Sequence, residues 1–298
     1  MLSGFEPFHD IGFKIKADFP LVTYSQAIPG DFPEIMTHWH DEMEILYFRK
    51  GQGYIDIGME RHEISEGDIV SVYPGQFHKL ECPVGGSLSY DVILFCLPML
   101  YTSQNDLCTE KYLLPLAEGR QDLPNILTPE DSCYPGVLEC VRDIWNISLY
   151  YPEGYPLAVK GRLFQLLYIL FYYQGEPLIK THRKKSEDNA RIVLDYVISH
   201  FREKLTVETM ASVSGLSESH FMKFFKTAAG VPFIEYLNDY RLFYGYTLLF
   251  ETEIPILDVA KECGFDNFSY FSRIFKREFG MTPSKFRKQA AQNLPLRQ

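Results

Sequence analysis

One pattern occurs twice in the sequence, and it constrains what the C-terminal third can fold into. In residues 256–276 (ILDVAKECGFDNFSYFSRIFK), Ala260 is followed four residues later by Gly264, and a second helical pattern comes next. Glycine adopts positive φ without a steric penalty, so a helix ends there readily. Phe271 and Phe275 are four residues apart and share one face of the second helix. Two short helices joined by a glycine turn are typical of a helix-turn-helix motif.

The same pattern stands upstream in residues 206–226 (TVETMASVSGLSESHFMKFFK). Ala211 again precedes Gly215 by four residues, and Phe221 and Phe225 repeat the aromatic pair. A period of about 50 residues with matched glycines indicates a duplicated module. A single helical corner with a glycine would not distinguish DNA binding from plain helix packing. Two matched copies favour DNA binding, in which the second helix of each motif enters the major groove.

A single helix is predicted between the two copies, over about residues 232–250. Pro232 suits a first helical turn, and an apolar stripe follows at helical spacing: Phe233, Tyr236, Leu237, Tyr240 and Tyr244. Such a helix is about 28 Å long. It would hold the two recognition helices near successive major-groove faces, which lie about 34 Å apart.

Further positions in and around the two motifs form a family pattern: Glu235–Leu237, Arg241, Leu248–Leu249, Val259–Phe265, Ser269–Lys276, Gly280, Thr282–Pro283 and Phe286–Arg287. Through them, residues 187–290 resemble the AraC/XylS family of transcription regulators. Gly245 departs from the family, which often has alanine there, at a cost of about 1 kcal/mol in helix propensity. The resemblance implies a sequence-specific DNA-binding regulator without catalytic residues.

The family pattern and helical geometry together predict the DNA-reading positions. Arg273 is expected to bond guanine and Asn267 to pair with adenine, while Lys226 and Lys276 suit phosphate. Lys223 stands where the family commonly has arginine, which weakens bidentate guanine recognition there. The base-reading set is Glu218, Ser219, Met222 and Lys223 in the first motif and Asn267, Phe268, Ser269 and Arg273 in the second.

The N-terminal half follows a different pattern. Residues 36–96 contain β-rich runs separated by glycine and proline turns. Short strands at roughly 10-residue spacing predict a small antiparallel β-barrel, cupin- or jelly-roll-like. The predicted strands cover 44–48, 53–57, 68–73 and 89–95.

A cluster of ionisable residues falls within these strands and resembles the two cupin motifs. His38, His40 and Glu44 share parity, so they face one side of a strand. His78 arrives from a partner strand, although Cys82 stands where the cupin pattern usually has asparagine. These four are candidate ligands for Zn, Fe, Mn or Ni. The same residues, with Tyr47, equally suit a polar pocket for an organic effector, which is the outcome we expect, with no cofactor required.

Aromatic residues near this cluster suit a sugar or another small polar ligand, because aromatic faces with a few polar groups are typical of such pockets. Strand aromatics are equally common as plain core. The residues concerned are Trp39, Tyr47, Tyr54, Tyr73, Phe77 and Tyr90.

Two helices are predicted after the barrel, over 131–150 and 157–173, and the segment between the barrel and the first of them, 99–130, reads as irregular. In the family such helices usually form a homodimer, although they equally serve to cap the sensor core. A polar, basic linker follows at 175–188. We therefore expect a cupin-like sensor and dimerisation domain over 1–180 and a DNA-binding domain over 181–298, with helix-turn-helix motifs near 206–228 and 255–278.

Charge and cysteine content agree with this division. The net charge is −10, but residues 183–298 carry 17 Lys and Arg against 14 Asp and Glu, so the acidic excess belongs to the first half. That half is expected to face away from DNA.

The six cysteines lack metal-binding spacing and are typical of reduced thiols. No apolar run of 18 residues and no signal peptide is found, which predicts a cytoplasmic protein without a membrane partner.

The sequence thus predicts an α+β protein of two domains: an antiparallel β-barrel with packed helices, and an all-α domain with two helix-turn-helix motifs on a linker helix. Its predicted function is transcription regulation in response to a small molecule. The expected partners are double-stranded DNA, the effector, a second copy of the chain and, for an activator, RNA polymerase. The rival hypothesis is a metal-dependent cupin oxygenase or isomerase fused to a DNA-binding domain.

Overall fold

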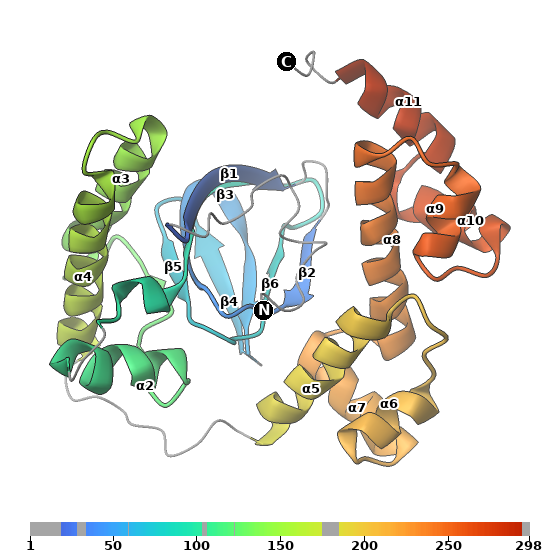
Figure 1. Ribbon diagram of the computed structural model, residues 1–298, viewed down its shortest axis with the longest axis horizontal. Helices are drawn as coiled ribbons and strands as arrows, with labels where there is room; N and C mark the ends of the chain where they lie inside the picture. The colour runs from blue at the N-terminus through green and yellow to red at the C-terminus, as the bar shows by residue number, and fades with distance from the viewer. Residues whose placement is uncertain are drawn as a thin grey trace. The chain divides into compact units, whose positions relative to one another are not determined.

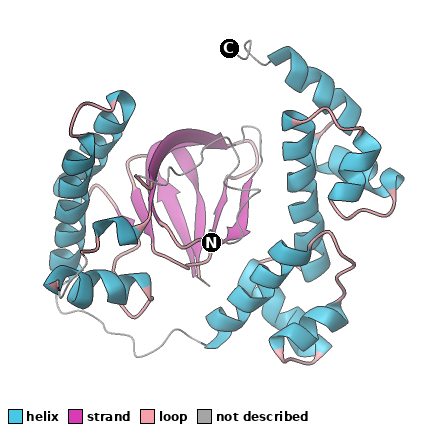
Figure 2. Ribbon diagram, in the orientation of Figure 1, coloured by secondary structure: helices cyan, strands magenta, loops and turns pink. Residues whose placement is uncertain are grey.

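The computed structural model describes residues 19–28, 34–58, 60–102, 106–121, 123–174 and 185–293 (Figure 1). The described chain falls into two compact units, one over 19–174 and one over 185–293. The first unit combines a β-sheet with helices and the second is entirely helical (Figure 2). The predicted domain boundary near residue 180 lies outside the described residues.

The first unit is built on an antiparallel sheet. Strand order is β1-β7-β3-β5-β8, with β4 and β6 also paired to β3 and β2 paired to β6. The first part of β3 pairs with β5 and β7, and its last part pairs with β4 and β6, so this one strand joins two sheet layers. The strands are β1 (Leu21–Ile28), β2 (Glu34–His38), β3 (Met43–Ile57), β4 (Glu60–Ser65), β5 (Ile69–Val72), β6 (His78–Glu81), β7 (Leu88–Phe95) and β8 (Ile126–Leu127).

The bend within β3 requires glycine. The pairing register with β7 shifts between Phe48 and Lys50. Gly51 follows with φ of 96°, and a Cβ there would lie 1.9 Å from the backbone oxygen of Ser87. Only glycine allows two backbones to approach that closely.

Alternation along β3 separates two apolar cores. Met43 and Ile45 face the helices and pack in the cluster that includes Val141 and Leu166. Leu46 and its neighbours on the opposite face pack inside the sheet layers. The helix-facing core is covered by η1 (Leu97–Leu100), η2 (Thr109–Leu113), α2 (Leu114–Ala117), α3 (Tyr134–Tyr150) and α4 (Tyr155–Gln174). Both predicted helices are therefore present, but the segment predicted as irregular holds three short helical elements and β8.

The second unit contains the duplicated motif. The two copies are the helix pairs α6–α7 and α9–α10. In each pair the helices are joined by a turn whose glycine, Gly215 or Gly264, has positive φ. Helix α8 runs between the two pairs (Figure 1). Phe225 packs edge-on against Tyr236 of α8, and Phe275 packs against Phe286. The helices are α5 (Lys185–His200), α6 (Val207–Ser214), α7 (Glu218–Ala229), α8 (Phe233–Glu251), α9 (Ile256–Glu262), α10 (Phe268–Phe279) and α11 (Pro283–Asn293). Among the described helices, none is long and apolar enough to cross a membrane.

The end of α5 joins the two motifs. The Arg241 guanidinium of α8 donates to the backbone oxygens of Phe201 and Glu203, both at 2.7 Å. Arg202 donates to the backbone oxygen of Glu262 at the end of α9, at 3.2 Å. These bonds satisfy carbonyls that a helix end leaves unpaired, so α5 is fastened to both α8 and α9.

Candidate DNA-binding surface and ligand site

The first recognition helix, α7, turns one polar face outward. Ser217 caps it by accepting from the backbone N–H of His220, a side-chain cap that favours helix initiation at this point. Phe221 and Phe225 are buried on its inner face. The residues predicted to contact DNA here are all exposed: Glu218, Ser219, Met222, Lys223 and Lys226.

The second recognition helix, α10, repeats this arrangement. Phe271 and Phe275 are fully buried, and the predicted contact residues are again exposed: Asn267, Phe268, Ser269, Arg273 and Lys276. Asn267 is the cap of the helix, because its Oδ1 accepts from the backbone N–H of Tyr270 at 2.9 Å. Pairing with adenine through both amide atoms would therefore require this oxygen to accept a second hydrogen bond beside the cap bond.

Tyr270 was not among the predicted site residues, yet it supports Arg273. The Arg273 guanidinium lies over the Tyr270 ring, 5.4 Å from its centroid. The Tyr270 hydroxyl accepts from Asn238 Nδ2 of α8 at 3.1 Å. The spacing of three residues on one helix was the available signal, since residues i and i+3 are neighbours.

In the first unit, four ionisable side chains meet between β2, β3 and β6. His38 and His78 are register partners at the ends of β2 and β6. One possible ligand atom from each of His38, His40 and His78 lies within 4.8 Å of the others. Glu44 Oε2, at the start of β3, lies 3.1 Å from His78 Nε2 and 3.5 Å from His40 Nε2. All four side chains are buried, each at most 8 % exposed.

Backbone carbonyls orient two of these imidazoles. His40 Nδ1 lies 3.0 Å from the backbone oxygen of Glu42, and His78 Nδ1 lies 3.0 Å from that of Gln76. An Nδ1–H that donates to a carbonyl leaves Nε2 as an acceptor that faces the cluster, which is the arrangement typical of metal-ligating histidines.

The cluster consequently attracts positive charge. Burial alone would raise the pKa of Glu44, but the imidazoles of His40 and His78 hold it well below its ordinary value. Burial would lower the pKa of His40, but Glu44 and Glu42 raise it. Neither Glu44 Oε2 nor His78 Nε2 has a hydrogen bond of acceptable geometry, despite the short distance between them. Two buried acceptors side by side are costly, so a proton or a cation is expected between them.

These residues fit a divalent metal ion. Imidazole nitrogens with one carboxylate are a ligand set that Zn and other first-row metals accept. His38, His40, His78 and Glu44 would hold it, and the ion would supply a positive charge and an open coordination position. The Glu42 and Gln76 carbonyls would fix the ring orientations.

Comparisons with known proteins agree with both units. Residues 31–167 match the profile of the AraC-like ligand binding domain, and residues 210–289 match that of a helix-turn-helix domain. The chain belongs to the AraC family of transcription regulators. The predicted family, fold class and regulatory function are thereby confirmed.

Several AraC-family relatives match over most of their length. The uncharacterized HTH-type transcriptional regulator YdeC of Bacillus subtilis is 28 % identical over 89 % of each chain. The HTH-type transcriptional activator RhaS of Mannheimia succiniciproducens is 23 % identical, covering 90 % of this chain and 94 % of the relative. Among solved structures, ToxT of Vibrio cholerae with a bound unsaturated fatty acid aligns over 90 % of this chain and 94 % of its own, at 17 % identity and a TM-score of 0.48.

Not every residue predicted for the ligand site of this AraC-family member reaches the cluster. Tyr47 lies on the opposite face of β3 from Glu44 and packs against the helix-facing core. Its inclusion was wrong, because residues three apart on a strand point to opposite faces.

Other aromatic residues suggested for the ligand site also pack elsewhere. Tyr73 belongs to that same core and donates to the backbone oxygen of Pro124. Tyr54 lies under the Arg61 guanidinium. Tyr90 packs in the core inside the sheet layers, where burial, and after it the charge of Glu44, raises the pKa of its hydroxyl.

Proposed function

We propose that this AraC-family regulator reads DNA through the exposed faces of α7 and α10, with residues 181–298 as the DNA-binding domain and residues 1–180 as the sensor. The observation that carries the proposal is the duplicated helix pair, each copy with a buried pair of phenylalanines on its inner face and polar residues on its outer face. Arg273 is the principal base-reading residue, and Lys226 and Lys276 contact phosphate. The protein acts in the cytoplasm, and as an activator it would also contact RNA polymerase.

The cluster of His38, His40, Glu44 and His78 is the proposed effector site. The sequence favours a polar organic effector there. The geometry favours a divalent metal ion, because three imidazoles converge and Glu44 Oε2 lies 3.1 Å from His78 Nε2 without a hydrogen bond between them. A ligand of either kind alters DNA binding only if it binds two states of the protein unequally. We propose transcriptional control as the output, and not catalysis, since the relatives are regulators.

Replacing His78 with glutamine tests this site. We expect wild-type protein to bind about one divalent ion per chain and His78→Gln to bind none. At a metal concentration 100 times the dissociation constant, the ion should add about 2.7 kcal/mol of stability to the wild type only. Elemental analysis and thermal unfolding with and without added Zn²⁺ or Mn²⁺ measure both effects.

His62→Gln is the matched control, because His62 lies on β4 outside the cluster and is partly exposed. This variant should bind metal as the wild type does. Wild-type protein without metal and without a thermal shift in either ion would favour the organic effector. Equal metal binding by both variants would place the ion elsewhere.

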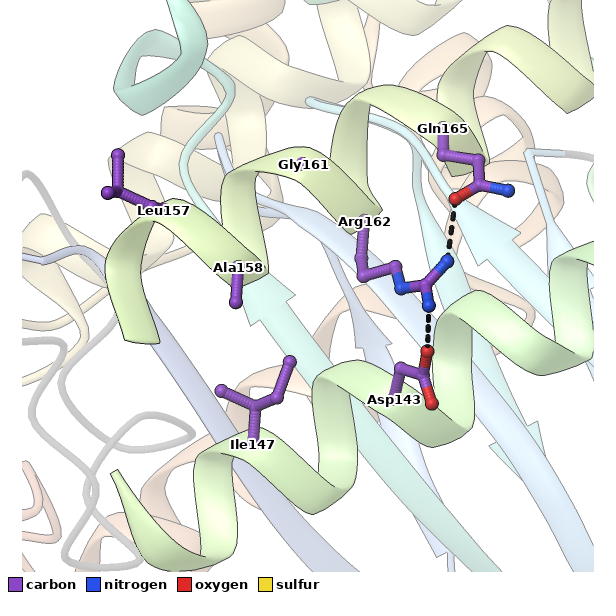
Figure 3. A pocket seen from close by; sticks show the side chains of 7 residues that line it. All are labelled: Asp143, Ile147, Leu157, Ala158, Gly161, Arg162 and Gln165. Atoms are coloured by element: carbon purple, nitrogen blue, oxygen red, sulfur yellow. Dashed lines mark hydrogen bonds and ion pairs between the residues drawn. The ribbon is translucent and has the colours of Figure 1, made fainter. Parts of the chain in front are cut away.

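We propose a homodimer formed along the hairpin of α3 and α4. A groove of about 590 Å³ runs between these helices and is lined by Asp143, Ile147, Leu157, Ala158, Gly161, Arg162 and Gln165 (Figure 3). Arg162 lies across it and bonds Asp143 at 2.5 Å and Gln165 at 2.7 Å. At one end of the hairpin, Tyr150 and Leu157 are 81 % and 80 % exposed. Large exposed apolar residues beside a groove mark interaction surfaces.

Gly161 gives this proposal a sharp test. Nothing lies within 4 Å of a Cβ added there, so Gly161→Glu should leave the monomer intact and gain about 1 kcal/mol of helix propensity. In the dimer the buried carboxylate should weaken association at least about tenfold, or about 1.4 kcal/mol. Sedimentation equilibrium measures association, and Gly161→Ala serves as the small control. A Gly161→Glu protein that dimerises normally would place the interface elsewhere.

A further inference from the structure

A second cavity lies in the first unit, away from the histidine cluster. It occupies about 660 Å³ between η2 and the C-terminal half of α4, a volume within the range of small-molecule sites. Its inner wall is formed by Leu113 and Leu167, each at most 3 % exposed. Phe171 and Tyr112 also line it and pack edge to face against each other, with ring centroids 5.2 Å apart. The cavity is therefore shaped for an apolar or aromatic body.

One polar side chain in this wall has no partner. Gln121 lines the cavity and is only 6 % exposed. Within the part of the chain that the structure describes, its side-chain amide makes no hydrogen bond, although its backbone N–H bonds Pro115. The residue is nearly buried, but its amide atoms are not sealed from solvent, since they open into the cavity. The Gln121 amide is therefore available to hydrogen-bond a polar atom of a ligand inside the cavity.

A cation stands in the same lining. Lys111 is exposed, and its ammonium lies 5.3 Å from the centroid of the Tyr112 ring. No carboxylate of the described residues forms an ion pair with Lys111. Lys111 belongs to η2, which is a π-helix, and such segments occur frequently at functional sites. An unpaired lysine beside an apolar cavity favours an anionic ligand over a neutral one.

We propose that this cavity binds a small hydrophobic carboxylic acid. Its apolar part packs on Leu113, Leu167 and Phe171. The Gln121 amide hydrogen-bonds a polar atom of the ligand, and Lys111 attracts its negative charge. The site is separate from the histidine cluster and does not depend on what that cluster binds.

The position of the cavity on α4 gives the ligand a route to regulation. One flank of α4, with Leu157 and Gly161, lines the groove between α3 and α4. Further along the same helix, Phe164, Leu167 and Phe171 line this cavity. A ligand that packs on one flank changes the position of the helix only if it binds two arrangements unequally, and the same helix carries the proposed dimer surface.

Titration calorimetry on the full chain with naphthalene-1-acetic acid tests the proposal. The neutral analogue 2-(1-naphthyl)ethanol is the matched ligand. We expect the acid to bind about tenfold more tightly than the alcohol, since a charge-assisted contact contributes on the order of 1.5 kcal/mol. Lys111→Gln should remove that preference, and Lys50→Gln, a change at an exposed lysine of β3, should keep it.

Gln121→Leu separates a ligand contact from a structural role. It should weaken binding of the acid about tenfold and leave the melting temperature unchanged or higher, because the amide has no internal partner to lose. The proposal is overturned by an absence of binding heat, by equal affinity for acid and alcohol, or by affinity that neither variant changes. A lowered melting temperature in Gln121→Leu would also overturn it, because the amide would then be bonded within the protein.

Discussion

Gly264→Ala is expected to destabilise the second helix-turn-helix motif by about 2–5 kcal/mol. Gly264 has φ of 78°, where an alanine costs about 1–2 kcal/mol. An added Cβ would also lie 2.8 Å from the backbone of Phe201 and Arg202 at the end of α5, and such overpacking costs about 1–3 kcal/mol more. Hydrogen exchange followed by mass spectrometry measures the effect, as faster exchange in peptides from α9 and α10.

Gly215→Ala is the matched control, because Gly215 occupies the same turn of the first motif. Its φ is 66°, but nothing lies within 4 Å of an added Cβ. The expected cost is therefore only the backbone term of about 1–2 kcal/mol. Equal destabilisation by the two substitutions would show that the contact between Gly264 and the end of α5 does not constrain the fold.

Arg273→Ala is expected to weaken binding to the preferred DNA site by about 1–3 kcal/mol, or about 5- to 150-fold, and to relax discrimination at one base pair. Arg273 is exposed on α10 and lies over the Tyr270 ring, which Asn238 fixes. A guanidinium already held in place loses less entropy when it bonds guanine. Fluorescence anisotropy with the preferred site and with single-base variants measures both effects.

Lys276→Ala is the comparison for Arg273→Ala. Lys276 is exposed in the last turn of α10, where we expect a phosphate contact. Its loss should weaken binding to all DNA sequences alike. It should also reduce the slope of log affinity against log salt concentration by about one. If Arg273→Ala also weakened specific and random DNA equally, Arg273 would be a phosphate contact and not a base-reading residue.

The helical unit could be predicted closely because its signals are local. The paired phenylalanines, the turn glycines and the apolar stripe of α8 each fix one element without reference to distant residues. The contact between Gly264 and the end of α5 could not be predicted in this way. Both motifs carry the same glycine, and only tertiary packing distinguishes Gly264 from Gly215.

The sensor unit was harder to predict for the same reason. The shared parity of His38, His40 and Glu44 placed them together, and pairing of β2 with β6 added His78. The same parity places Tyr47 on the opposite face of β3, away from the cluster. Residues 99–130 form elements as short as two to five residues, whose patterns are too brief to read. The cavity beside α4 depends on those elements, so it could not be predicted from local patterns.

Selection from a random DNA library by the full chain tests the central claim most directly. Two recognition helices joined by α8 predict an enriched site with two conserved blocks about one helical turn, or about 34 Å, apart. The Arg273→Ala protein should lose its base preference at one position in one of the two blocks and keep it at the other positions. Enrichment of a single block would mean that one motif alone reads DNA. No enrichment over the starting library would contradict the account.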